Sequence, residues 1–112
     1  MTGVTGNWES GTGQRPLTGK QRAYLRGLGQ DLTPIVFIGK AGITPAIQVQ
    51  LEDAIQAHEL VKCRILPNAP GAPKEIAAAL AEDSKSVLLG VVGRNFLVFR
   101  RSMEKPEIEL PG

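Results

Sequence analysis

Apolar residues between positions 17 and 102 repeat with two different periods, and each change of period marks a boundary between a predicted helix and a predicted strand. After the candidate N-cap Thr18, leucines follow at helical spacing until Pro34 ends the pattern. Thr44 followed by Pro45 is a second helix start, because threonine favours the N-cap and proline the first helical position. The pattern predicts helices over 18–32, 44–58 and 74–82, and strands over 35–38, 60–66, 86–92 and 96–101.

The strand over 60–66 shows the clearest alternation of side-chain character. Its two predicted faces are Val61, Cys63 and Ile65 on one side and Leu60, Lys62 and Arg64 on the other. One apolar and one basic face suit a sheet that helices cover on one side only. We therefore predict an α/β fold of the two-layer α+β type. It is a single compact domain with the order α-β-α-β-α-β-β, whose helices pack on one face of a four-stranded mixed sheet.

The two ends of the chain lack either period. Residues 1–16 are rich in glycine, threonine and serine, so we expect a disordered leader. Residues 103–112 are acidic and interrupted by prolines, and we expect a flexible tail. The folded domain is predicted to span residues 17–102.

Composition narrows the class of protein. A chain of 112 residues suits one domain, and its 42% hydrophobic residues suffice for a core. Aromatic residues make up only 4%, so the core must be mainly aliphatic and stacking on nucleobases is expected to be minor. One cysteine excludes a disulfide within the chain. Because no segment approaches the roughly 20 apolar residues of a membrane helix, we expect a cytoplasmic protein that does not contact membranes.

Charge is more informative in its distribution than in its total, which is +2. Segments 17–40, 60–74 and 87–101 are net basic, and the segments between and after them are net acidic. If the basic segments share a face, a nearly neutral protein presents a strong local positive field. The alternative is ordinary mixing of charges on a solvated surface.

The segment 39–42, Gly39-Lys40-Ala41-Gly42, lies between a predicted strand and a predicted capped helix. Glycines permit a tight bend and close approach of a ligand to the backbone. The helix start offers unpaired N–H groups and Lys40 adds a positive charge, so this loop suits a phosphate. A GxxG pattern by itself can be a simple turn, but in KH modules such a loop holds the backbone of single-stranded nucleic acid.

Catalysis finds little support in the sequence. The one histidine, His58, lies at a helix end, where a capping or packing role is more common than that of a base. Cys63 lies on an apolar strand face, where a cysteine is usually inert. The loop matches neither GxxxxGK[ST] nor GxGxxG. We expect no enzyme, no cofactor, no metal and no small-molecule substrate, and a nucleotide-dependent enzyme would lack a carboxylate pair for its Mg²⁺.

Several motifs in order resemble the CRM domain, the family of chloroplast RNA splicing and ribosome maturation proteins whose stand-alone bacterial form is YhbY-like. They are LTGKQR at 17–22, LTP at 32–34, IGKAGIT at 38–44, HELVK at 58–62, GRN at 93–95 and VFR at 98–100. The resemblance covers about residues 17–102. It implies a fold similar to the C-terminal domain of translation initiation factor three, and it implies RNA binding. Bacterial members of the family are linked to precursors of the large ribosomal subunit, and plant members to group II intron splicing.

Matched to the family, the GKxG loop is residues 39–42, and the terminal LYR motif becomes Val98-Phe99-Arg100. Phe99 keeps a ring but lacks the tyrosine hydroxyl: if that hydroxyl contacts RNA in relatives, the contact is absent here, and otherwise Phe99 is a core residue. Where the family often has Ala-His, this chain has Gly29-Gln30, and Thr33 occupies a commonly basic position. Both changes remove possible positive charge from the presumed RNA face.

The sequence therefore predicts an RNA-binding protein that acts on large-subunit ribosomal RNA or a pre-ribosomal particle. The alternative is an adaptor that docks on a ribosomal protein through its sheet face or acidic tail. The predicted RNA contacts are Gly39, Lys40, Ala41 and Gly42 with Lys20, Arg22 and Arg26, and in second rank Lys62, Arg64, Arg94, Arg100 and Arg101.

Overall fold

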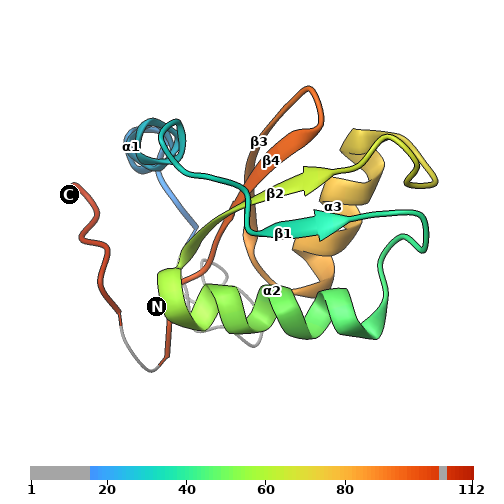
Figure 1. Cartoon of the computed structure of the whole chain (residues 1–112). Coiled ribbons are helices and arrows are strands. Elements are labelled where there is room, and N and C mark those ends of the chain that lie inside the picture. Colours follow the sequence, from blue (N-terminus) through green and yellow to red (C-terminus); the bar gives the residue numbers. More distant parts are fainter. Residues whose placement is uncertain (1–15, 104–105) are drawn as a thin grey trace.

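A computed structural model of the chain describes residues 16–103 and 106–112. The elements follow the predicted order: α1 (Gly19–Gly29), β1 (Val36–Ile38), α2 (Pro45–His58), β2 (Leu60–Ile65), α3 (Pro73–Asp83), β3 (Val87–Val92) and β4 (Asn95–Phe99). Three helices and one four-stranded sheet confirm the predicted α/β class (Figure 1). The predicted leader, apart from Pro16, lies outside the described residues.

The sheet has the strand order β1-β2-β4-β3 and is mixed, as predicted. β1 pairs with β2 in parallel, with Phe37 in register with Arg64. β4 runs antiparallel to both β2 and β3, and a turn at Gly93 closes the β3–β4 hairpin. A parallel pair needs a crossover connection. Helix α2 provides it, because it leads the chain from the end of β1 back to the level at which β2 begins.

The starts of α1 and α2 follow the capping signals in the sequence. The Thr44 hydroxyl accepts a hydrogen bond from the Ile47 N–H at 3.2 Å, and Pro45 occupies the first turn. Thr18 caps α1 in the same way and forms a full capping box, because the Gln21 side chain accepts from the Thr18 N–H at 3.0 Å.

The main core lies between the sheet and the pair α2 and α3. We call the sheet face toward these helices the inner face. Side chains from both layers form one buried cluster on it, including Leu51 and Ile55 of α2, Leu80 of α3, and Val61, Cys63, Ile65, Phe96 and Val98 of the strands. These strand residues alternate along β2 and β4, so a single face of the sheet supplies them.

The prediction that all helices cover one face is wrong for α1, which packs on the opposite, outer face. Leu25 of α1 is fully buried in a second cluster with Leu60, Leu89 and Phe99. Figure 1 shows α1 and α2 on opposite sides of the sheet. The sequence predicted that Leu60, Lys62 and Arg64 form an uncovered face of β2. In the structure, α1 covers the Leu60 end of this face. Phe99 is a core residue.

Gly29 lets α1 approach this outer face closely. A β-carbon at this position would lie 2.4 Å from Cδ1 of Leu97. The absence of a side chain therefore allows the helix end to rest directly on β4.

The segment after β4 returns to α1 instead of leaving the domain. Ile108 and Leu110 pack against the outer cluster, and the Gln21 side chain donates to the Pro111 carbonyl at 3.0 Å. The predicted boundary at 102 and the predicted flexibility of the tail stay predictions. Residues 106–112 nevertheless have defined partners in the fold.

Glu59 holds this returning segment through its buried carboxylate. Oε1 accepts from the N–H groups of Glu107 and Ile108 at 2.9 and 2.8 Å, and Oε2 accepts from the N–H of Ser102 at 2.8 Å. Glu59 is 1% exposed and adopts φ 66° at the end of α2, a conformation that favours glycine. Its hydrogen bonds thus outweigh the backbone strain.

We expect Glu59→Ala to lower the free energy of unfolding by about 3 kcal/mol, because three backbone N–H groups lose their acceptor. Urea unfolding followed by circular dichroism measures this change. Glu59→Gly should recover about 1 kcal/mol of the loss, since glycine relieves the strained φ. Glu82→Ala, at an exposed position of α3, is the control and should change stability by less than about 0.5 kcal/mol. A Glu59→Gly variant as stable as wild type would contradict the anchoring role.

Candidate nucleic-acid interface

The loop 39–42 follows β1 directly and leads into α2. The N–H of Gly42 donates to the carbonyl of Gly39 at 2.9 Å, so the four residues form a closed turn. Gly42 adopts φ +71°, where a side chain would be strained. Lys40 is exposed at the tip of this turn, and no acidic residue occupies the first turn of α2. The positive end of the α2 dipole therefore remains uncompensated within that turn.

Two further loops pack beside this turn. The N–H of Leu66, which follows β2, donates to the Ile38 carbonyl at 2.8 Å. A β-carbon on Gly42 would lie 3.5 Å from Cγ of Pro70 in the loop between β2 and α3. The β3–β4 turn joins them, since Arg94 donates from Nη1 to the Leu66 carbonyl at 3.3 Å. We use the name loop edge for these three loops, residues 39–44, 66–72 and 93–94, together with Arg64 and Asn95 at the adjoining strand ends.

The loop edge gathers three of the predicted basic contacts. Lys40, Arg64 and Arg94 are all exposed there, and Arg64 donates from Nη1 to Oδ1 of Asn95 at 3.4 Å. These three elements meet because β1 and β2 are parallel and end together, while the β3–β4 hairpin turns at the same edge. Within residues 16–103 and 106–112, none of these three cations forms an ion pair with an acidic side chain.

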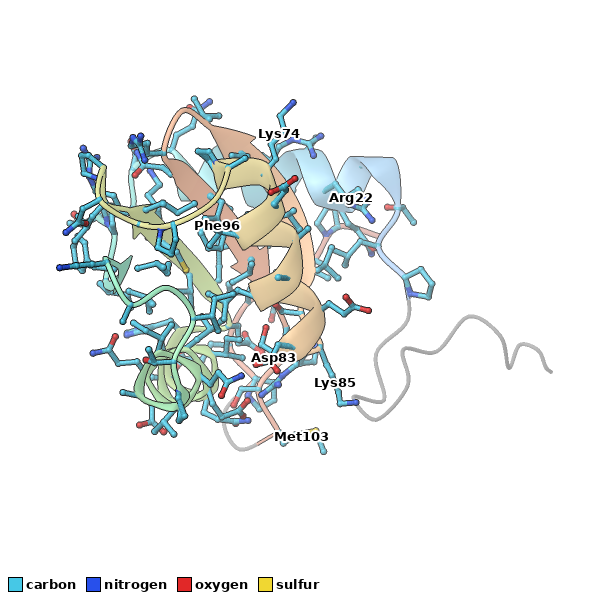
Figure 2. All side chains as sticks on the ribbon, turned by 90° about the vertical axis from the view of Figure 1, so that its right-hand side faces the viewer. Arg22, Lys74, Asp83, Lys85, Phe96 and Met103 are labelled. Atoms are coloured by element: carbon cyan, nitrogen blue, oxygen red, sulfur yellow. The ribbon has the colours of Figure 1, made fainter. Side chains whose placement is uncertain are left out.

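Lys74 adds a cation that sequence reasoning did not propose as a contact. It is exposed in the first turn of α3, which begins directly after the loop edge. Figure 2 looks toward this edge and shows Lys74 at one end of α3, with Asp83 and Lys85 at the other. The parallel β1–β2 geometry could have indicated it, because a helix that follows such a strand begins at the same edge.

The basic residues of α1 lie on the outer face of the sheet. Arg26 donates from Nη1 to the Leu89 carbonyl at 3.2 Å and lines a groove with Lys62, Asn95 and Leu97. This groove runs between α1 and the sheet toward the loop edge, to which Asn95 belongs. Lys20 and Arg22 share no hydrogen bond or ion pair with the loop edge among the described residues.

Arg100 lies at the far edge of the sheet and has partners within the protein. Its side chain donates to the Ser84 carbonyl at 2.8 Å and forms an ion pair with Glu52. The hydrogen bond from the Arg100 guanidinium holds the pKa of the Glu52 carboxyl below its ordinary value. Arg101 lies nearby and pairs with Glu59 at 3.7 Å. We therefore do not include Arg100 or Arg101 in the candidate interface, because their charge is directed to structural carboxylates.

The candidate catalytic groups are placed as the sequence predicted. Cys63 is fully buried in the inner core, and burial raises the pKa of its thiol to about 12. His58 is the exposed last residue of α2. In the part of the chain that the structure describes, no three His, Cys, Asp or Glu side chains gather as metal ligands. The same part contains no helix that is long and apolar enough to cross a membrane.

We expect Cys63 to resist a thiol reagent such as Ellman's reagent at pH 8 in the folded protein and to react fully in guanidinium chloride. A thiol with a pKa of about 12 has almost no thiolate at pH 8, and the core shields it. The folded state raises this pKa above its unfolded value, so the fold loses stability progressively as the pH rises from about 9 toward about 12. Rapid reaction under native conditions would contradict the buried placement.

The chain is similar to known proteins over most of its length. A model of the CRS1 / YhbY (CRM) domain matches residues 17–100. The chain is 37% identical over 95 residues to the probable RNA-binding protein YqeI of Bacillus subtilis, which covers 85% of this chain and 99% of that protein. It is 32% identical over 99 residues to an RNA-binding protein of Haemophilus influenzae, covering 85% and 95% respectively.

A solved structure is similar as well. The solution structure of the hypothetical protein SAV1595 from Staphylococcus aureus superposes with a TM-score of 0.72 at 42% sequence identity. The match covers 86% of this chain and all of that chain. The similarity therefore extends over the whole described fold and not only over the GKxG loop.

Proposed function

The chain belongs to the CRS1 / YhbY (CRM) domain family, and from this premise we propose that it binds RNA through the loop edge. The observation that carries the proposal is the convergence of Lys40, Arg64 and Arg94 beside the start of α2. Three exposed cations and a helix N-terminus suit a run of phosphates, which basic side chains and backbone N–H groups contact without regard to base.

The basic groove beside α1 extends this surface. Arg26 and Lys62 line it together, and Asn95 connects it to the loop edge. An RNA strand that contacts the loop 39–42 can thus continue across the outer face of the sheet. Lys20 and Arg22 stand further along α1 and are proposed to meet neighbouring phosphates.

The target that the family resemblance favours is large-subunit ribosomal RNA. We propose that the protein acts in the cytoplasm as a stoichiometric ribosome assembly factor on this RNA or on a pre-ribosomal particle. The names of the relatives support RNA binding in general.

A direct test of this target is crosslinking of the tagged protein to RNA in cells, followed by sequencing. Enrichment of large-subunit precursors is expected, and enrichment of other RNA classes alone would overturn this target.

We expect Lys40→Ala to weaken RNA binding about equally for different sequences and to reduce the slope of log K against log salt by about one. Lys40 stands at the tip of the loop, so its removal deletes one phosphate contact and leaves the fold intact. Fluorescence anisotropy with labelled ribosomal RNA fragments at several salt concentrations measures both effects.

Lys85→Ala is the matched control. Lys85 is also exposed but follows α3 at the end opposite Lys74, so its removal deletes the same charge far from the loop edge (Figure 2). If Lys40→Ala and Lys85→Ala weaken binding equally, the charge of the whole protein is responsible and the loop has no special role.

Salt also separates this proposal from the adaptor alternative. Binding through several phosphates should weaken steeply as salt rises, because each contact releases condensed counterions. Between 50 and 200 mM salt we expect the affinity of the wild-type protein to fall by about tenfold or more. An interaction with ribosomes that is insensitive to salt and to ribonuclease would favour docking on a ribosomal protein.

A further inference from the structure

Phe37 is an aromatic side chain that neither the core nor the phosphate contacts of the proposed interface use. It is the middle residue of β1, an edge strand, between the buried Val36 and Ile38. Alternation directs Phe37 to the outer face, where it is 46% exposed. Phe96 and Phe99 are each 1% exposed, so among the described phenylalanines only Phe37 offers its ring to a ligand.

The surroundings of Phe37 are cationic. Arg64 is its register partner on β2, and Asn95 is the register partner of Arg64 on β4. These three residues therefore form one row across the outer face. Two residues nearer the start of the strands, the Ile35 N–H donates to the carbonyl of Lys62 at 3.0 Å, which places exposed Ile35 beside a second cation.

Phe37 is also continuous with the candidate interface. It precedes Lys40 by three residues, and its partner Arg64 belongs to the loop edge. An apolar ring flanked by positive charge fits a nucleobase joined to its phosphates, since the ring stacks on the base and the cations meet the backbone. A purely apolar partner would leave Arg64 and Lys62 without complementary charge.

We infer that the outer face is a stacking site in which Phe37 holds one unpaired nucleobase of the RNA while Arg64 contacts the adjoining phosphate. This inference rests on the proposed RNA binding and specifies the ligand further, as RNA that contains an unstacked base. The proposal departs from the expectation that stacking is minor, because a count of aromatic residues does not say which one lies on an open sheet face.

The test compares single-stranded with double-stranded RNA. Fluorescence anisotropy is measured with a labelled twelve-nucleotide oligoadenylate, and with the same strand paired to oligouridylate. Phe37→Ala should weaken binding of the single strand between about fivefold and 150-fold, the range found when stacking residues are truncated. Binding of the duplex should change by less than about twofold, because its bases are already stacked.

Two matched variants separate stacking from loss of apolar surface. Phe37→Leu keeps an apolar side chain without the ring and should still weaken binding of the single strand. Val49→Ala removes apolar surface from a 60% exposed position of α2 and should leave it unchanged. Circular dichroism confirms that each variant is folded. Equal binding of oligoadenylate by wild type, Phe37→Ala and Phe37→Leu would overturn the stacking site.

A fluorescent variant gives an independent readout. In a Trp8→Phe background, Phe37→Trp leaves one tryptophan, placed at the proposed stacking site. Saturating oligoadenylate should quench its emission, and an unchanged emission on binding would contradict stacking.

The two proposals fail in different ways. If wild type binds neither RNA, the proposed function fails and the stacking site with it. If Lys40→Ala weakens binding of both RNAs while Phe37→Ala changes neither, RNA binding stands and only the stacking site is wrong.

Discussion

Two parallel strands that are neighbours in a sheet need a crossover connection, and in this chain α2 makes it between β1 and β2. The arrangement has one unavoidable consequence, which is that both strands end at the same edge and the helices after them begin there. The loop 39–42, the start of α3 and the positive ends of two helix dipoles therefore lie together. The β3–β4 turn joins them because β4 pairs antiparallel to β2.

The opposite edge of the sheet, where α2 ends and β2 begins, contains buried and paired charges that stabilise the fold. There α2 ends at His58, and the chain enters β2 after the single residue Glu59. So abrupt a reversal requires a backbone conformation that favours glycine, and the buried carboxylate compensates by accepting three backbone hydrogen bonds. Arg100 and Arg101 lie at this edge and pair with carboxylates. Among the described residues, Arg100 and Arg101 thus have a structural role, whereas Lys40, Arg64 and Arg94 form no ion pair.

The two faces of the sheet also differ. α2 and α3 cover the inner face and bury the larger cluster, whereas α1 and the returning C-terminal segment cover only part of the outer face. What remains open on the outer face is the portion nearest the loop edge, with Phe37 and Arg64. This uncovered surface lies next to the clustered cations, and it is here that we propose a nucleobase and its phosphates bind.

Local signals in the sequence determined the elements of this protein. Helical and strand periods with threonine caps at 18 and 44 fixed the helix starts and the order of the elements, since such signals depend on residues within one or two turns. The role of the GKxG loop as a phosphate site is predicted from the same kind of local signal and stays a prediction. Only the tertiary structure decided which face α1 covers, that Arg64 and Arg94 join Lys40 while Arg100 does not, and that Glu59 anchors the C-terminal segment. Each of these facts depends on contacts between residues far apart in the chain. Hydrophobic periodicity and amino-acid composition contain no information about such contacts.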